Sequence, residues 1–318
     1  MAKIRTHDQG HKETDTVLLN LEKRLRREYE QAYKEISKKA NDYFDKFAER
    51  DKRQRALVES GGLSAADYKR WRRNQMLSGK RWTDLRDYLA EDLTNTNAIA
   101  MAMVRDELPD VFAINANYTE YEIENGLRTN YGFTLYSRET VENLIKDNRD
   151  LLPAPTVDIA KDLRWNKQHI QSAITQGVLQ GESAANVAKR LQTVANMDAA
   201  AAMRSARTAV TGAQNAGRQF VYDRAAEMGL PLKKEWMATR DNRTRHEHGV
   251  ADGQIVGLKQ PFVIGGYNMK YPGDTSAPGH LVYNCRCTTV TVEAEHITKG
   301  TEPRKTWAEW KAERGSVK

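Results

Sequence analysis

The sequence contains 318 residues, which is enough for two or three domains that each bury a core. Hydrophobic residues make up 39% and charged residues 29% of the chain, a polar composition that suits long exposed helices. No apolar run is long enough to span a bilayer, and residues 1–16 lack the apolar core of a signal peptide. We therefore expect a protein without a membrane anchor that is made and used without secretion.

The net charge of +7 is unevenly distributed along the chain. Basic residues clearly outnumber acidic ones between Arg50 and Arg86, with local peaks at residues 69–73 and 80–82, where tryptophans are interleaved. Such a stretch can bind nucleic-acid phosphates or an acidic protein face. A solvated helix surface explains the same pattern, so both interpretations stay open.

The N-terminal third is predicted to be helical after a polar, mobile start over residues 1–13. From Thr16 to about Leu57, apolar residues recur every eleven residues, which keeps them on one face of a long, nearly straight helix. This helix should end at Gly61-Gly62. Ser64 is the expected N-cap of a short helix that stops at Gly79.

The next helix is expected to begin at Thr83 and to end at about Leu108, because Pro109 disfavours continuation. Residues 98–104 are apolar on nearly all faces of this helix and should be buried in a helical bundle. A further helix is predicted to reach about Leu127, and another one to open after Ser137.

Pro153-Ala154-Pro155 is the best candidate hinge, since no helix passes through Pro-x-Pro. Three helices should follow it: one over residues 161–179, one capped by Ser183 that runs to about Val194, and one capped by Asp198 that runs to Met228. From Leu232 onward the pattern changes to short strands with Gly, Pro, Asn and Asp turns.

These patterns predict a mainly α protein with a C-terminal α+β module. The expected segments are an elongated helical region with long N-terminal helices (1–152), a helical part of the C-terminal module (153–231), a small strand-and-loop α+β domain (232–296) and a C-terminal tail (297–318). In the tail, Trp307 and Trp310 share one face of a short helix, which should dock onto this molecule or onto a partner.

Both cysteines and most of the polar turn formers lie between Trp236 and Thr288. Cys285 and Cys287 are two apart on an expected strand, so their sulfurs point to the same side. Their Cα atoms would lie at the edge of disulfide reach, so we expect metal binding or plain thiols rather than a bridge. The equally spaced His246 and His248 would complete a four-ligand zinc site. His280 is the substitute if His246 faces solvent.

A structural interpretation without metal uses the same segment. Asp241 would cap the following turn, Asp252-Gly253 would form a tight turn, and Asn284 would bond backbone near a strand start. Arginines would pair with acids to hold the long loops together. The expected pairs join Arg243, Arg245 and Arg286 to Asp252 and Asp274.

This ordered set resembles the C-terminal module of the Mu F-like phage minor head proteins, also called phage head morphogenesis proteins. The resemblance is carried by residues 241–246, Asp252-Gly253, Pro261-Phe262, Pro272-Gly273-Asp274 and Asn284–Cys287. It extends upstream through residues 176–183, 206–208 and 215–218, and so covers roughly residues 162–292. Relatives often carry a cysteine at the place of His248, which favours His248 as a ligand.

The resemblance implies a minor capsid protein of a tailed bacteriophage. Such a protein would act in head morphogenesis, next to the portal protein and to major capsid or scaffold proteins, with a possible part in DNA packaging or ejection. It would reside in the virion, inside the head, and in the host cytoplasm during assembly. Nonspecific DNA contact by the basic stretch fits this role.

The alternative is a DNA-binding or nuclease-like effector carried in the head. Arg243, His246, His248 and Asp252 would be its catalytic candidates, because a His can transfer a proton while an Arg stabilises phosphate charge. There is no carboxylate cluster for magnesium. Glu293-Ala294-Glu295 matches a feature of ADP-ribosyltransferases, but their Ser-Thr-Ser strand is missing, so we expect no enzyme activity.

Overall fold

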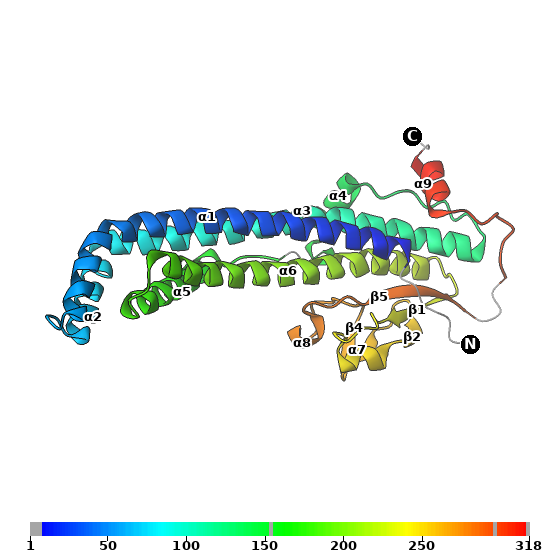
Figure 1. Ribbon diagram of the computed structural model, residues 1–318. Coiled ribbons are helices and arrows are strands. Elements are labelled where there is room, and N and C mark those ends of the chain that lie inside the picture. The colour runs from blue at the N-terminus through cyan, green and yellow to red at the C-terminus, as the bar shows by residue number, and fades with distance from the viewer. Residues whose placement is uncertain (1–7, 153–154, 295–297, 316–318) are drawn as a thin grey trace. The chain divides into compact units, whose positions relative to one another are not determined.

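The computed structural model describes residues 8–152, 155–294 and 298–315. It confirms a mainly α protein with long N-terminal helices and a small C-terminal α+β part (Figure 1). The chain divides into two compact units. The helical unit comprises Lys23–Ala102 and Thr156–Met203, and the mixed unit comprises Met1–Glu22, Met103–Pro155 and Arg204–Lys318. These discontinuous units cut across the consecutive segments expected from changes in composition, because three helices contribute to both.

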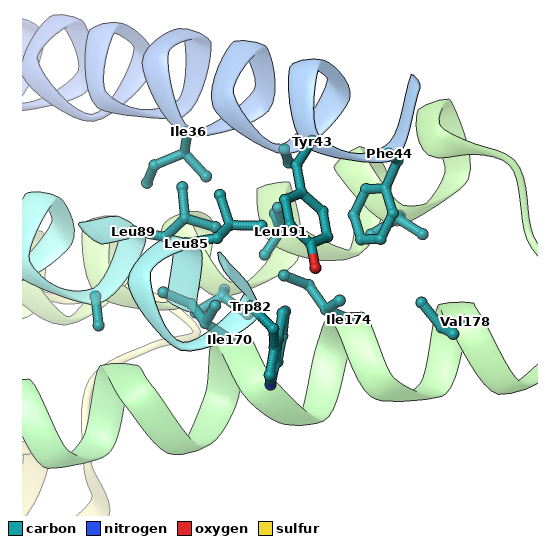
Figure 2. Close-up of a cluster of buried hydrophobic side chains, with 14 of the residues drawn as sticks. Ile36, Tyr43, Phe44, Trp82, Leu85, Leu89, Ile170, Ile174, Val178 and Leu191 are labelled. Atoms are coloured by element: carbon teal, nitrogen blue, oxygen red, sulfur yellow. The ribbon is translucent and has the colours of Figure 1, made fainter. Parts of the chain in front are cut away.

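The helical unit is built from parts of α1 (Gln9–Glu59), α3 (Lys80–Leu127) and α6 (Ala184–Glu227), together with α2 (Ala65–Met76) and α5 (Ile159–Leu179). The eleven-residue pattern of α1 places Leu25, Ile36 and Phe47 in the interior. Figure 2 shows Ile36 facing side chains from the other helices, and the labelled core residues are Ile36, Tyr43, Phe44, Trp82, Leu85, Leu89, Ile170, Ile174, Val178 and Leu191.

Three predicted helix boundaries are wrong. Thr83, expected to start a helix, lies inside α3, which begins at Lys80. Pro109 lies inside α3, and Asp198 lies inside α6. A proline costs a helix one hydrogen bond and a steric clash, but the turns around Pro109 bury Leu108, Val111 and Phe112, and this packing keeps the helix continuous. Asp198 caps no helix; its carboxylate accepts a hydrogen bond from Asn97 at 3.2 Å.

Several local signals were interpreted correctly. Ser64 and Ser137 are the N-caps of α2 and of α4 (Arg138–Asp147), and each accepts a bond from a first-turn N–H. Ser183 likewise accepts from the N–H of Asn186, next to the start of α6. Helix α1 already begins at Gln9, so the polar start is shorter than expected. Pro153 and Ala154 of the candidate hinge lie outside the described residues; a short 3-10 helix, η1 (Arg149–Leu151), precedes them.

The strand-and-loop region, residues 232–293 of the mixed unit, contains two small sheets. In the first, β1 (Leu232–Met237) lies between β2 (Ile255–Gly257) and β5 (Thr288–Glu293), antiparallel to both. In the second, β3 (Phe262–Ile264) and β4 (Tyr267–Met269) form a hairpin. Two one- or two-turn helices, α7 (His246–Ala251) and α8 (Gly279–Val282), lie in the loops between strands. Trp236 and Phe262 anchor the core of this region.

The predicted C-terminal helix is α9 (Trp307–Gly315), and both of its tryptophans are buried against this molecule. Trp307 packs edge-on against Tyr118, and the Nε1 of Trp310 donates to Glu124 at 2.6 Å. None of the described helices combines the length and the apolar character needed to cross a membrane.

Candidate functional site

Helix α6 holds the backbone that carries both cysteines. The Oγ1 of Thr208 accepts a bond from the N–H of Asn284 at 2.8 Å, and the Oγ1 of Thr211 donates to the carbonyl of Cys285 at 2.7 Å. The Nδ2 of Asn215 donates to the carbonyl of Cys287 at 3.1 Å. The three α6 side chains are spaced at i, i+3 and i+7 and therefore lie on one helix face. These bonds join the α6 motif residues to the cysteine segment, which follows about 75 residues later in the sequence.

Asn284 turns the chain into the cysteine segment by its backbone conformation. Its φ of 59° lies in the left-handed region, where asparagine is tolerated better than most residues. We expected its side chain to bond the backbone; the bond that the structure shows at this residue is the one from its own N–H to Thr208.

His248, Cys285 and Cys287 form a compact cluster. Their ligand atoms all lie within 4.8 Å of one another, and the side chains are 1%, 2% and 3% exposed. The Nδ1 of His248 is 3.5 Å from the Sγ of Cys285 and 3.4 Å from the Sγ of Cys287. Both cysteines are free thiols. The described residues thus bring together three atoms that suit a soft metal ion.

Both cysteines of this cluster lie in the apolar core of the strand-and-loop region. The indole of Trp236 meets the imidazole of His248 edge-on, with ring centroids 5.5 Å apart. The N–H of Cys287 points at the Sγ of Cys285 at 3.4 Å. Contact with the Cys287 side chain lowers the pKa of Cys285, whereas the same contact and burial raise the pKa of Cys287.

His246 and His280 do not join the cluster. Both are exposed, and the ring of His280 faces Tyr267 at 6.2 Å. Two residues apart on a strand would place His246 beside His248, but the segment is helix α7, in which such residues point to different sides. The helical conformation therefore separates the histidine pair that the sequence suggested as joint ligands.

The arginine pairs differ from those expected. Asp241 binds Arg286 through both carboxylate oxygens, at 2.6 and 2.8 Å, and accepts from the N–H of Arg243 at 2.9 Å. Arg286 is the main cause of the lowered pKa of Asp241. Arg245 donates instead to the carbonyl of Tyr283. Asp241 thus caps its turn as predicted, and it takes the arginine that we had assigned to other acids.

Asp252 and Asp274 bind other partners than the expected arginines. Asp252 pairs with Arg240 and accepts from the N–H of Ala238 at 3.0 Å. Asp274 accepts from the N–H of Lys270 at 2.8 Å and from both the N–H and the hydroxyl of Ser276. Each acid therefore stabilises a loop by accepting bonds from backbone N–H groups. Pairing acidic with basic residues in the sequence does not reveal such bonds.

The glycines of these motifs allow close contacts and turns. Gly253 has a φ of 87°, and the N–H of Gln254 donates to the carbonyl of Ala251 at 2.9 Å across Asp252-Gly253, which forms the predicted turn. Gly273, which follows Pro272, has a φ of 88°, and a Cβ there would meet the N of Gly212 at 2.9 Å. The Pro-Gly-Asp loop can therefore lie directly on α6 only because residue 273 has no side chain.

A buried cation that the sequence analysis did not single out links four segments of the mixed unit. Arg218 is 0% exposed and donates to the carboxylate of Asp8 at 2.7 Å, to the Oδ1 of Asn115 at 3.1 Å and to the carbonyl of Thr289 at 2.8 Å. Its only sequence signal was its place in the motif at residues 215–218. Asp8 and Asn115 had no signal, because their role depends on contacts more than 100 residues away in sequence.

An open depression of about 510 Å³ lies on the outer side of α7, lined by Arg240, Asp241, Arg245 and His246 among others. It holds some of the residues of the nuclease alternative, but His248 is in the core and lines no part of it. The structure therefore does not bring His246 and His248 together as a catalytic pair.

Comparison with known proteins gives consistent results. Residues 168–290 match the family described as Phage Mu protein F like protein. Minor head protein GP7 of Bacillus phage SPP1 is 26% identical over 301 residues, which is 92% of this chain and 88% of GP7.

Two further relatives match over shorter stretches. An NAD(+)–arginine ADP-ribosyltransferase, EFV, of Enterococcus faecalis is 32% identical over 155 residues, and an uncharacterised protein of Haemophilus influenzae is 26% identical over 172 residues. The chain covers 32% and 35% of the lengths of these two proteins. No solved structure matches the chain. Residues 168–290 thus match the model of the phage Mu protein F like family, and the chain is similar over most of its length to a phage minor head protein.

Proposed function

We propose that this chain is a minor capsid protein of a tailed bacteriophage, located in the virion, that acts in head morphogenesis beside the portal and the major capsid or scaffold proteins. The observation that carries the proposal is the extent of the similarity to GP7, 92% of this chain against 88% of that protein. The likeness therefore includes the helical unit and is not limited to the family domain at residues 168–290.

The folded C-terminal part suits a protein of assembly. Its motif residues are used for internal bonds, as in the Asp241–Arg286 pair and the α6 bonds to the cysteine segment. They stabilise long loops and leave few groups for chemistry. A rigid module of this kind can present one fixed surface to a partner protein.

The test is deletion of the gene from a phage that carries it, with complementation by the intact chain. We expect heads that are fewer or less infectious, and we expect the protein to co-purify with the portal from immature heads. Its absence from both immature heads and purified virions, by mass spectrometry, would refute the proposal.

A second activity, nonspecific DNA contact, is favoured by one observation. Residues 50–86 contain eleven basic and four acidic residues, so their surplus equals the +7 of the whole chain. Six of the basic side chains are exposed and form no ion pair within the described ranges: Lys52, Arg53, Lys69, Arg73, Lys80 and Arg81. Unpaired cations on one part of the helical unit are what phosphate binding requires.

A matched pair of variants tests this activity. Changing Lys52, Arg53, Arg73 and Arg81 to Gln should weaken retardation of random-sequence duplex DNA and flatten its salt dependence, by about 0.9 in the log–log slope for each phosphate that the variant no longer neutralises. The control changes Arg26, Arg27, Lys34 and Lys38, four exposed cations of α1 in the same unit, and lowers the net charge equally. Equal weakening in both variants would show that only net charge matters.

The enzyme alternative has less support. The similarity to the ADP-ribosyltransferase EFV covers 32% of that enzyme. Of the Glu-x-Glu feature, Glu293 pairs with Lys299, and Glu295 lies outside the described residues. Transfer of ADP-ribose from labelled NAD(+) to arginine by the purified chain, abolished in Glu293→Gln, would establish the alternative.

A further inference from the structure

We propose that one Zn²⁺ ion binds to the Nδ1 of His248 and the sulfurs of Cys285 and Cys287, with a water molecule as its fourth ligand. The ion would join α7 to the segment that leads into β5. The ion would stabilise the folded state of this region, and its binding does not depend on the proposed function of the protein.

The spacing of the three atoms fits tetrahedral coordination. Zinc bonds of about 2.3 Å to sulfur and about 2.0 Å to nitrogen place two tetrahedral ligands about 3.5 Å apart. The observed separations from the Nδ1 of His248 are 3.5 Å to Cys285 and 3.4 Å to Cys287. The two sulfurs lie within 4.8 Å of each other, so all three atoms are close enough to surround one ion.

The chemistry of the donors selects the metal. Two thiolates and one imidazole, with no carboxylate among them, favour zinc and exclude calcium and magnesium, which bind oxygen. The Cys287 N–H that points at the Sγ of Cys285 at 3.4 Å would stabilise a bound thiolate.

The protein holds the ligands in place from outside the cluster. Thr211 and Asn215 of α6 fix the carbonyls of the two cysteines, and the indole of Trp236 fixes the plane of the imidazole. Such supporting contacts are what a metal site needs beyond its direct ligands. The buried cluster is thus already arranged for binding.

The ion would close a long loop. His248 and the cysteines are 37 and 39 residues apart in sequence, and the chain between them contains three of the short strands. A bridge across such a loop stabilises the folded state, because a preformed site does not exist in the unfolded chain. Zinc would therefore compensate for the small apolar core of this region.

The ligand count separates this proposal from the four-residue set suggested by the sequence. Within the described part of the chain, no fourth His, Cys, Asp or Glu atom lies close to all three. His246 is exposed on another side of α7. A tetrahedral zinc ion has four coordination positions, and the protein fills three of them. We assign the fourth position to water, because water is the smallest available ligand.

The experiment is metal analysis of the purified full chain after equilibration with zinc, together with absorption spectra of the Co²⁺-substituted protein. We expect one zinc per chain and a tetrahedral cobalt spectrum with sulfur-to-metal charge transfer. Cys285→Ser/Cys287→Ser and His248→Asn should lose the ion, whereas His246→Asn and His280→Asn, which change exposed histidines, should retain it.

Circular dichroism of each variant shows whether the metal is lost because a ligand was removed or because the variant does not fold. The cobalt spectrum of the unaltered chain tests the proposed ligands without any substitution. The proposal is overturned if the unaltered chain retains no zinc, if the double serine variant keeps it, or if His246→Asn loses as much zinc as His248→Asn.

Discussion

The helical unit and the strand-and-loop region are stabilised in different ways. The helical unit buries a continuous set of apolar side chains from five helices, such as Ile36, Leu89 and Ile170. The strand-and-loop region has a small core around Trp236 and relies on side-chain bonds to backbone, such as that from Thr211 to Cys285. A periodic core tolerates local irregularities, whereas a region of loops depends on individual polar contacts.

The strongest test of this contrast is Arg218→Leu in the mixed unit. The change leaves the carboxylate of Asp8 and the carbonyl of Thr289 without their buried partner, so we expect a decrease of about 3–5 kcal/mol in the free energy of unfolding. Urea denaturation followed by circular dichroism measures it. Arg207→Leu is the control on the same helix, because the Arg207–Glu22 pair is partly exposed and should contribute less than about 1 kcal/mol. Equal decreases in the two variants would contradict the prediction.

The corresponding test of the helical unit is Leu89→Ala. Leu89 is fully buried in the core of Figure 2, and its truncation should cost about 2–4 kcal/mol through reduced burial and a residual cavity. Ile99→Ala, on the same helix and partly exposed, should cost clearly less. The measurement is the same denaturation; a cost for Leu89→Ala no larger than that for Ile99→Ala would show that this core is not closely packed.

A pH dependence sharpens the comparison, because the helical unit contains a buried polar layer. Asp198 and Asp162 both accept bonds from the Nδ2 of Asn97, at 3.2 and 2.9 Å, and Tyr29 donates to the Oδ1 of Asn97 at 2.6 Å. Burial raises the pKa of Asp198 to about 7, with a further contribution from the charge of Asp162. The folded state thus keeps a proton that the unfolded chain has released.

The contribution of Asp198 to stability is therefore fully present below about pH 4 and is lost as the pH rises towards about 7. Asp198→Asn should remove this dependence and raise the stability at pH 8 by about 1–3 kcal/mol. Thermal unfolding at several pH values measures the effect. Asp84→Asn, an exposed carboxylate of the same unit, is the control, and identical pH profiles for Asp198→Asn and the unaltered chain would exclude the effect.

The smallest expected effect is at Asn284 in the strand-and-loop region. Because its φ is 59°, Asn284→Ala should cost about 1 kcal/mol, and Asn284→Gly should cost little or even stabilise. Amide hydrogen exchange of residues 285–290 measures the change locally. A greater loss of protection for the glycine variant than for the alanine variant would show that the side chain, and not the backbone conformation, is important here.

The sequence alone determined the features that depend on a few neighbouring residues. The eleven-residue pattern specifies the buried face of α1, and the serines at 64, 137 and 183 specify helix starts, because an N-cap acts within three residues. The cysteine segment and the Asp241 turn were identifiable for the same reason.

Tertiary structure decided the features that depend on distant partners. The packing of its neighbours keeps α3 continuous through Pro109, and the helical conformation of α7 sends His246 to the surface while His248 enters the core. Arg286 binds Asp241 rather than Asp252, and Arg218 reaches Asp8. Local patterns cannot specify such choices, since the free energy of a buried contact depends on which groups the whole fold brings within bonding distance.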